Sequence, residues 1–230
     1  IRDQEDLTSY ADSPYSCECD RGLPDTNLNN SAGESRCNIR WANSDGDIGV
    51  GDDFSLPTGN WIIDGIRVWI VPQVSMWPTY SLGDHFESIA LYVGAAGGSL
   101  MQLSGGTFTP GTSSTDNPNI SFVRVKYQNQ NEKDYQAADG AYSQVWQVDF
   151  SNLNWAVTGG TSYVFGVHAV PCVDRQLFLH ATHWTSQGDG LIRRFDVGNL
   201  SAGSTTASGS GWFGGKGSDI NVQVFAHVAQ

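Results

Sequence analysis

From about residue 48 onward, the chain alternates apolar and polar positions with a period of two, which predicts strands rather than helices. In DGIRVWIV, the residues Ile66, Val68 and Ile70 fall on one face, and Arg67 and Trp69 fall on the other. The same alternation recurs in six further stretches: HFESIALYVGA, ISFVRVKYQ, SQVWQVDF, TSYVFGVHAV, RQLFLHATHW and INVQVFAHV. The sequence has no sustained helical period, and only NQNEKDYQAADGAYS has room for one short helical turn.

Each alternating stretch separates two sets of side chains. HFESIALYVGA places Ile89, Leu91 and Val93 opposite Phe86 and Tyr92. ISFVRVKYQ sets its valines opposite its phenylalanine, SQVWQVDF sets Trp146, Val148 and Phe150 opposite Gln147 and Asp149, and INVQVFAHV sets Ile220, Val222, Val224, Ala226 and Val228 opposite the rest. One apolar set per strand is the pattern of a sheet with one face on a core.

Clusters of turn residues separate the strands. They are GAAGG, LSGGTFTPGTSSTDNPN, VTGGTS, TSQGDG and SAGSTTASGSGWFGGKGS. Half-buried strands with such turns predict an all-β, antiparallel sandwich. A jelly roll is favoured over an immunoglobulin topology, because the loops are long and the Cys–Trp–Cys spacing of that fold is missing. We expect one sandwich domain over residues 41–230.

Residues 1–40 have no period of 2 or 3.6, so we expect an irregular N-terminal arm. The four cysteines Cys17, Cys19, Cys37 and Cys172 predict two disulfides that tie this arm to the domain. Cys17 and Cys19 are too close in sequence to pair well, so each is expected to bond Cys37 or Cys172, in either connectivity. A zinc site built on the Cys-x-Cys pair is the alternative.

The charge balance narrows the class of partner. Twelve Lys and Arg against 24 Asp and Glu give a net charge of −12. Nucleic acid and anionic membranes are disfavoured, because phosphate binding needs clustered cations. No apolar run approaches the roughly 20 residues of a membrane-spanning helix. The low fraction of charged residues and the even number of cysteines are typical of exported proteins, so we expect a secreted or cell-surface protein. Because the sequence begins at Ile1 and not at Met, we also expect that a signal peptide has been removed.

The loop NSDGDIGVGDDF brings together Asp45, Asp47, Asp52 and Asp53. Oxygen ligands on a glycine-rich loop suit calcium, although the loop lacks the EF-hand spacing. The other interpretation is a polar edge at the start of the strand. We expect Asp52 and Asp53 to form that edge, and the calcium site stays open.

Patterns for catalysis are weak, so we predict that the chain is not an enzyme. A G-x-S-x-G elbow, a phosphate loop and a dinucleotide fingerprint are missing from the sequence. His180 and His183 are three apart, so on a strand they face opposite sides and cannot easily share a metal. Glu87 is the only glutamate within a predicted strand. We interpret the histidines as hydrogen-bonded strand residues and the carboxylates as surface groups.

Aromatic residues are the remaining signal. Eight tryptophans occur, and Trp77, Trp184 and Trp212 lie in or beside loops. Such side chains either cover a sheet end or form a contact surface for sugar rings or another protein. The three sequons, at Asn29, Asn119 and Asn199, permit N-glycosylation only in a source that performs it.

GDDFSLPTGNWIIDGIRVWIV resembles a strand motif of exported bacterial β-sandwich domains of the choice-of-anchor type. FESIALYVG, VWQVDFSNLNWAVTGGTSYVFGV and the ending SGWFGGKGSDINVQVFAHV are similar to later parts of those domains. The resemblance covers about residues 48–230 and leaves out the cysteine-bearing arm. It implies a β-sandwich fold and names no common activity.

Together these patterns predict a non-catalytic extracellular structural protein, a subunit of a filament, layer or matrix that associates with itself. The alternative is a jelly-roll carbohydrate-binding module for an extracellular polysaccharide, with structural calcium. A flat row of Trp77, Trp184 and Trp212 would favour sugar, and a patch buried by another copy would favour assembly.

Overall fold

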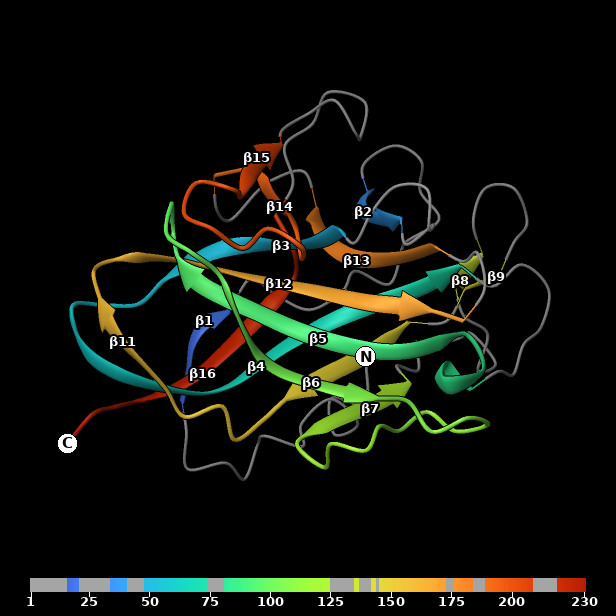
Figure 1. Ribbon diagram of the computed structural model, residues 1–230. Coiled ribbons are helices and arrows are strands. Elements are labelled where there is room, and N and C mark those ends of the chain that lie inside the picture. Colours follow the sequence, from blue (N-terminus) through green and yellow to red (C-terminus); the bar gives the residue numbers. More distant parts are fainter. Residues whose placement is uncertain are drawn as a thin grey trace.

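The computed structural model describes residues 16–20, 34–40, 48–73, 81–124, 135–136, 142–143, 145–172, 176–183, 189–208 and 219–230. The regular elements of this part are strands and one short 3-10 helix, η2 (Leu82–Asp84). The strands form two antiparallel sheets, so the predicted all-β sandwich is confirmed (Figure 1). Within the described ranges, no helix has the length and apolar character needed to cross a membrane.

The smaller of the two main sheets has six strands in the order β15-β14-β3-β12-β5-β6. These strands are β3 (Ile48–Ser55), β5 (Phe86–Ala95), β6 (Met101–Thr107), β12 (Ser162–Pro171), β14 (Ile192–Asp196) and β15 (Thr206–Ser208).

The larger sheet has eight strands, with β1-β16-β4-β10-β7 as its main order. β11 and β13 also pair with β4, and β2 pairs with β13. These strands are β1 (Ser16–Asp20), β2 (Glu34–Arg40), β4 (Gly59–Gln73), β7 (Ile120–Arg124), β10 (Trp146–Phe150), β11 (Trp155–Gly159), β13 (Gln176–His183) and β16 (Val222–Val228). A separate hairpin joins β8 (Tyr135–Gln136) to β9 (Tyr142–Ser143).

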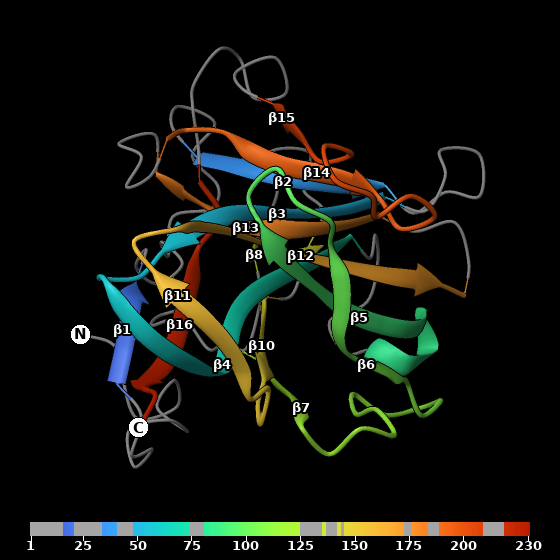
Figure 2. The ribbon, with the colours of Figure 1, turned by 60° about the vertical axis from the view of Figure 1, so that its left-hand side comes forward.

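The strand order has the jelly-roll feature that the sequence predicted. The chain runs from β3 to β4 to β5, changing sheet each time. On its way back, it inserts β10 between β4 and β7, and β12 between β3 and β5. Inserting returning strands between earlier ones is how a jelly roll closes two facing sheets. In Figure 2, β16, β4 and β10 lie below β3 and β12.

The core lies between the two sheets and is filled by the apolar sets that the alternation predicted. From the larger sheet come Ile63, Ile66, Val68, Ile70, Trp146, Val148, Phe150, Ile220, Val222, Val224 and Ala226; from the smaller come Val50, Phe54, Ile89, Leu91, Val93, Phe165 and Val167. Val228, at the end of β16, is 60% exposed, so the predicted apolar row stops at Ala226.

Two predicted strand faces need correction. Phe86 belongs to the same core as Ile89 and Leu91, because the register of β5 against β12 shifts near its end. In β7, Ile120 and Phe122 turn toward the core instead of the valine. In β5, the irregular pairing changes which residues share a face, and a strict period of two cannot anticipate it. In β7, the pairing with β10 is regular and the alternation holds, so only the choice of the inward face changes.

The expectation of an irregular arm over residues 1–40 is wrong at two places. Ser16–Asp20 forms β1 and pairs with β16, and Glu34–Arg40 forms β2 and pairs with β13. Both strands lie at sheet edges, where pairing needs only a free neighbouring strand and no long apolar row. The remaining residues of the arm lie outside the described part.

Candidate functional site

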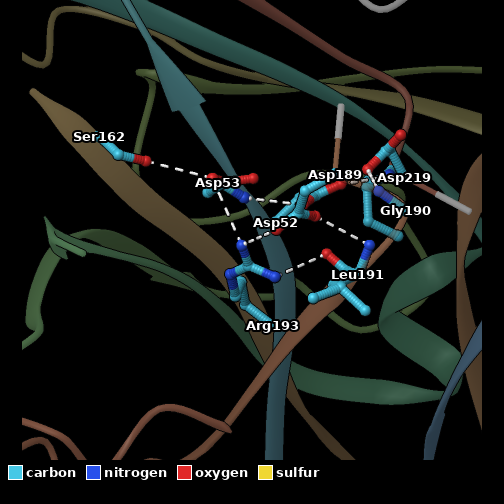
Figure 3. Close-up of polar contacts among 9 residues, drawn as sticks. Asp52, Asp53, Ser162, Asp189, Gly190, Leu191, Arg193 and Asp219 are labelled. Atoms are coloured by element: carbon cyan, nitrogen blue, oxygen red, sulfur yellow. Dashed lines mark hydrogen bonds and ion pairs between the residues drawn. The ribbon is translucent and has the colours of Figure 1, made fainter. Parts of the chain in front are cut away.

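The acidic pair at the end of β3 is the centre of a cluster that extends to other segments. Carboxylate oxygens of Asp52, Asp53 and Asp189 all lie within 4.8 Å of one another. Asp189 stands just before β14, which pairs with β3, so the sheet itself brings the three residues together. Figure 3 shows this acidic cluster with its polar contacts.

Asp52 is fully buried, so the prediction of a polar edge is wrong for this residue. It alternates with Val50 and Phe54 along β3, and both of these are core residues. Its Oδ1 accepts the backbone N–H of Asp53 at 2.8 Å, and its Oδ2 accepts the N–H of Ile220 at 2.6 Å. Ile220 lies two residues before β16, so Asp52 connects the smaller sheet to the approach of the larger one.

Asp53 lies at the surface side of the cluster and is half-buried. Its Oδ2 accepts the hydroxyl of Ser162 at 3.1 Å and lies 3.3 Å from Nη2 of Arg193. Ser162 begins β12 and Arg193 belongs to β14, the two neighbours of β3. Asp53 therefore ties β3 to both of its neighbours, but it lies inside this interior strand and not at the start of a strand as predicted.

Arg193 is the cation of the cluster. Its Nη2 contacts Oδ2 of Asp189 at 2.5 Å as well as Asp53 (Figure 3). Burial opposes its charged form, but the hydrogen bond with Asp189 and the charges of Asp53, Asp189 and Asp52 outweigh burial and raise the pKa of Arg193. The guanidinium thus stays charged beside three carboxylate groups.

Asp219 completes the site on the side of β16. It is fully buried, and its Oδ1 accepts the N–H of Gly190 at 3.0 Å. Asp189 in turn accepts the N–H of Leu191 at 2.8 Å through Oδ1. The turn at residues 189–191 is therefore fixed both from within and from the approach to β16.

The cluster has two chemical capacities. Its carboxylates already accept backbone N–H groups or contact Arg193, which makes them structural ties. A hard divalent cation prefers several carboxylate oxygens with an excess of negative charge, and the cluster offers both.

Asp45 and Asp47, the other two predicted ligands, lie outside the described residues, as do Trp77, Trp184 and Trp212.

The predicted bond of Cys172 to Cys17 or Cys19 is absent from the structure, and a bond of Cys37 to Cys17 or Cys19 stays a prediction. Cys17 and Cys19 belong to β1 and Cys37 belongs to β2, but their side chains are outside the described part. Cys172 is an exposed, free thiol. Partial burial, together with Glu87 and Asp84, raises the pKa of this thiol above its ordinary 9.0.

A second polar group occupies the outer face of the larger sheet and was not anticipated. Arg67 and Asp149 are buried cross-strand partners joined by two contacts, Nε to Oδ1 at 2.5 Å and Nη2 to Oδ2 at 3.1 Å. Arg67 also donates to Gln223 at 3.3 Å and lies 5.4 Å from the ring centre of Phe225. Further along this face, Asp64 and His227 lie 2.6 Å apart, which agrees with a hydrogen-bonded strand histidine.

The sequence had indicated only part of these two sites. Asp189 lies in the turn cluster TSQGDG, and Asp219 directly follows the Gly- and Ser-rich cluster that ends at Ser218. A single aspartate before a strand is too common at such places to signal a site. Arg67 and Asp149 follow the alternation that predicts an outward polar face. The alternation does not indicate whether other parts of the chain cover this outer face of the sheet.

Comparison with known proteins adds no family to this picture: neither family models, curated proteins nor solved structures match the chain.

Proposed function

We propose that this chain is a non-catalytic, exported structural module that builds or decorates an extracellular surface, filament or matrix. The main support for the proposal is that both carboxylates of the acidic pair, Asp52 and Asp53, make contacts that connect strands. Asp52 ties β3 to the approach of β16, and Asp53 ties β12 and β14 to β3. Carboxylates engaged in this way stabilise a scaffold, whereas general acid–base catalysis needs a carboxylate within reach of a substrate proton.

A structural module of this kind must associate with copies of itself. Light scattering across a concentration series, followed by negative-stain microscopy, tests this directly. We expect ordered particles or filaments that grow with concentration. The same series on thermally unfolded protein is the control that separates ordered assembly from aggregation. A strict monomer at high concentration would refute the proposal.

The acidic cluster favours a second candidate, a carbohydrate-binding module with structural calcium. Three carboxylates with oxygens within 4.8 Å of one another would attract a divalent cation. A bound ion would stabilise the fold by mass action, by about 2.7 kcal/mol at a concentration one hundred times its dissociation constant.

Thermal melts with calcium and with chelator test this candidate. Calcium should raise the melting temperature, and Asp189→Asn should abolish the increase. Asp196→Asn is the matched control, because Asp196 is an exposed carboxylate on β14 outside the cluster. Identical melting temperatures in calcium and in chelator would exclude a structural calcium ion. A glycan array that shows no binding would exclude a carbohydrate-binding function.

A further inference from the structure

Among the described residues, two buried polar atoms on the outer face of the larger sheet have no hydrogen-bond partner. They are the indole Nε1 of Trp69 and the side-chain Oε1 of Gln147. Both side chains are 0% exposed. An unsatisfied buried donor or acceptor costs about 1–3 kcal/mol, so a native fold rarely keeps one without compensation.

The two atoms belong to neighbouring side chains. Trp69 of β4 and Gln147 of β10 are direct cross-strand partners, so they stand on the same face of the sheet. Side chains paired in this way have Cβ atoms about 4.5–5.5 Å apart. The residues that carry the unpartnered donor and the unpartnered acceptor thus lie directly opposite each other on adjacent strands.

The orientation of the Gln147 amide is fixed by its neighbour. Its Nε2 donates to Oδ2 of Asp149 at 2.9 Å. Since an ionised carboxylate only accepts hydrogen bonds, the nitrogen must be the atom that faces Asp149. The amide cannot be reversed, and its oxygen is left to accept a hydrogen bond from another group.

This pair of atoms selects one kind of occupant. An anion would satisfy the indole N–H but could not donate to the amide oxygen. An ammonium ion would satisfy the oxygen but could not accept from the indole. A hydroxyl does both, because it carries one donor and two acceptor sites. The adjacent Arg67–Asp149 pair is neutral as a unit and gives no preference for a charged group.

We propose that Trp69 and Gln147 hold a single neutral hydroxyl between them, supplied by a buried water molecule. The complete burial of both side chains favours water over a hydroxyl of a larger saccharide. Buried waters bridging such groups typically make two to four hydrogen bonds. The inference goes beyond the proposed function, because it concerns the opposite face of the larger sheet from the core.

Nuclear magnetic resonance of the folded, full-length chain tests the proposal. The indole resonance of Trp69 is assigned by its loss in Trp69→Phe. In the unmodified chain, this indole proton should show a direct cross-peak to a long-lived water. Absence of that cross-peak in the unmodified chain overturns the proposal.

Gln147→Met tests the second half of the site. It should weaken or remove the water cross-peak and move the indole proton upfield. Gln102→Met is the matched control, since Gln102 is exposed on β6 of the other sheet, and it should leave the Trp69 resonance unchanged. A shift in Gln147→Met without any water cross-peak in the parent chain would indicate a direct indole–amide bond and overturn the proposal.

Titration with neutral saccharides separates the two sources of a hydroxyl. A water cross-peak that persists throughout supports water. A saccharide that replaces this cross-peak with its own contacts to the indole would overturn water as the source.

Discussion

Asp52 shows how much one buried carboxylate can do in this fold. It accepts two backbone N–H groups, and its partner Ile220 lies 168 positions away in the sequence. A buried carboxylate with such contacts connects segments that chain continuity cannot hold together. The residue is therefore better understood as an internal brace than as a reactive group.

Replacing Asp52 should cost stability without changing the fold. Asp52→Ala leaves the buried N–H of Ile220 without an acceptor, so we expect a loss of about 1–3 kcal/mol in the free energy of unfolding. Asp52→Asn should lose less, because its amide oxygen can still accept one bond. Urea denaturation measures both, with Ser55→Ala at the exposed end of β3 as the control. If all variants were equally stable, the prediction that Asp52 stabilises the contact between the two sheets would be contradicted.

The thiol of Cys172 should react slowly at neutral pH. Its pKa is raised above 9.0, so the reactive thiolate is scarcer at pH 7 than in an ordinary cysteine. We expect the alkylation rate of the native protein to rise as the pH passes 9, later than that of a free cysteine derivative. Rapid labelling at pH 7 would contradict this, and labelling only after reduction would show that Cys172 forms a disulfide.

At the scale of the element, the smaller sheet depends on close approach of its strands. A Cβ placed on Gly51 would lie 1.9 Å from the carbonyl oxygen of Phe165 on the adjacent strand β12. On the outer face of this sheet, the ring of Phe195 lies against Gly49 and Gly166, where any side chain would collide with it. These glycines are required by space and not by backbone angle.

Gly51→Ala should therefore disrupt the pairing of β3 with β12. Overpacking costs about 1–3 kcal/mol or more, and here the obstacle is backbone that cannot rotate away. Gly97→Ala is the matched control: its φ is +75°, but nothing lies within 4 Å of the added carbon, so only the backbone strain of about 1–2 kcal/mol applies. Thermal melts that show Gly97→Ala as the more damaging change would contradict this.

The elements also show which information the sequence contains. The inner faces of β4, β10 and β16 follow from alternation alone, because the core accepts only apolar side chains. The burial of Arg67 and Asp149 does not follow, since the same alternation fits a face in water. The acidic pair Asp52 and Asp53 could be identified, but Asp189 joins them only through strand pairing, which depends on the whole topology.

For the whole molecule, net charge should control association. With a net charge of −12 and an isoelectric point near 4.5, copies repel one another at neutral pH. Carboxylates gain protons as the pH falls toward 4.5, so repulsion decreases and light scattering should rise reversibly. Salt at neutral pH should act in the same direction, because charges are screened beyond about 10 Å at 0.1 M. Scattering that ignores both variables would contradict a charge-limited assembly.

The position of β16 has a consequence for how the protein matures. This strand follows every other described strand, yet it lies between β1 and β4 and supplies Val222, Val224 and Ala226 to the core. During translation, the larger sheet therefore lacks an interior strand until the ribosome has made nearly the whole described chain. Contacts between such distant segments form slowly. The larger sheet of a nascent chain would thus remain incomplete until β16 has been made.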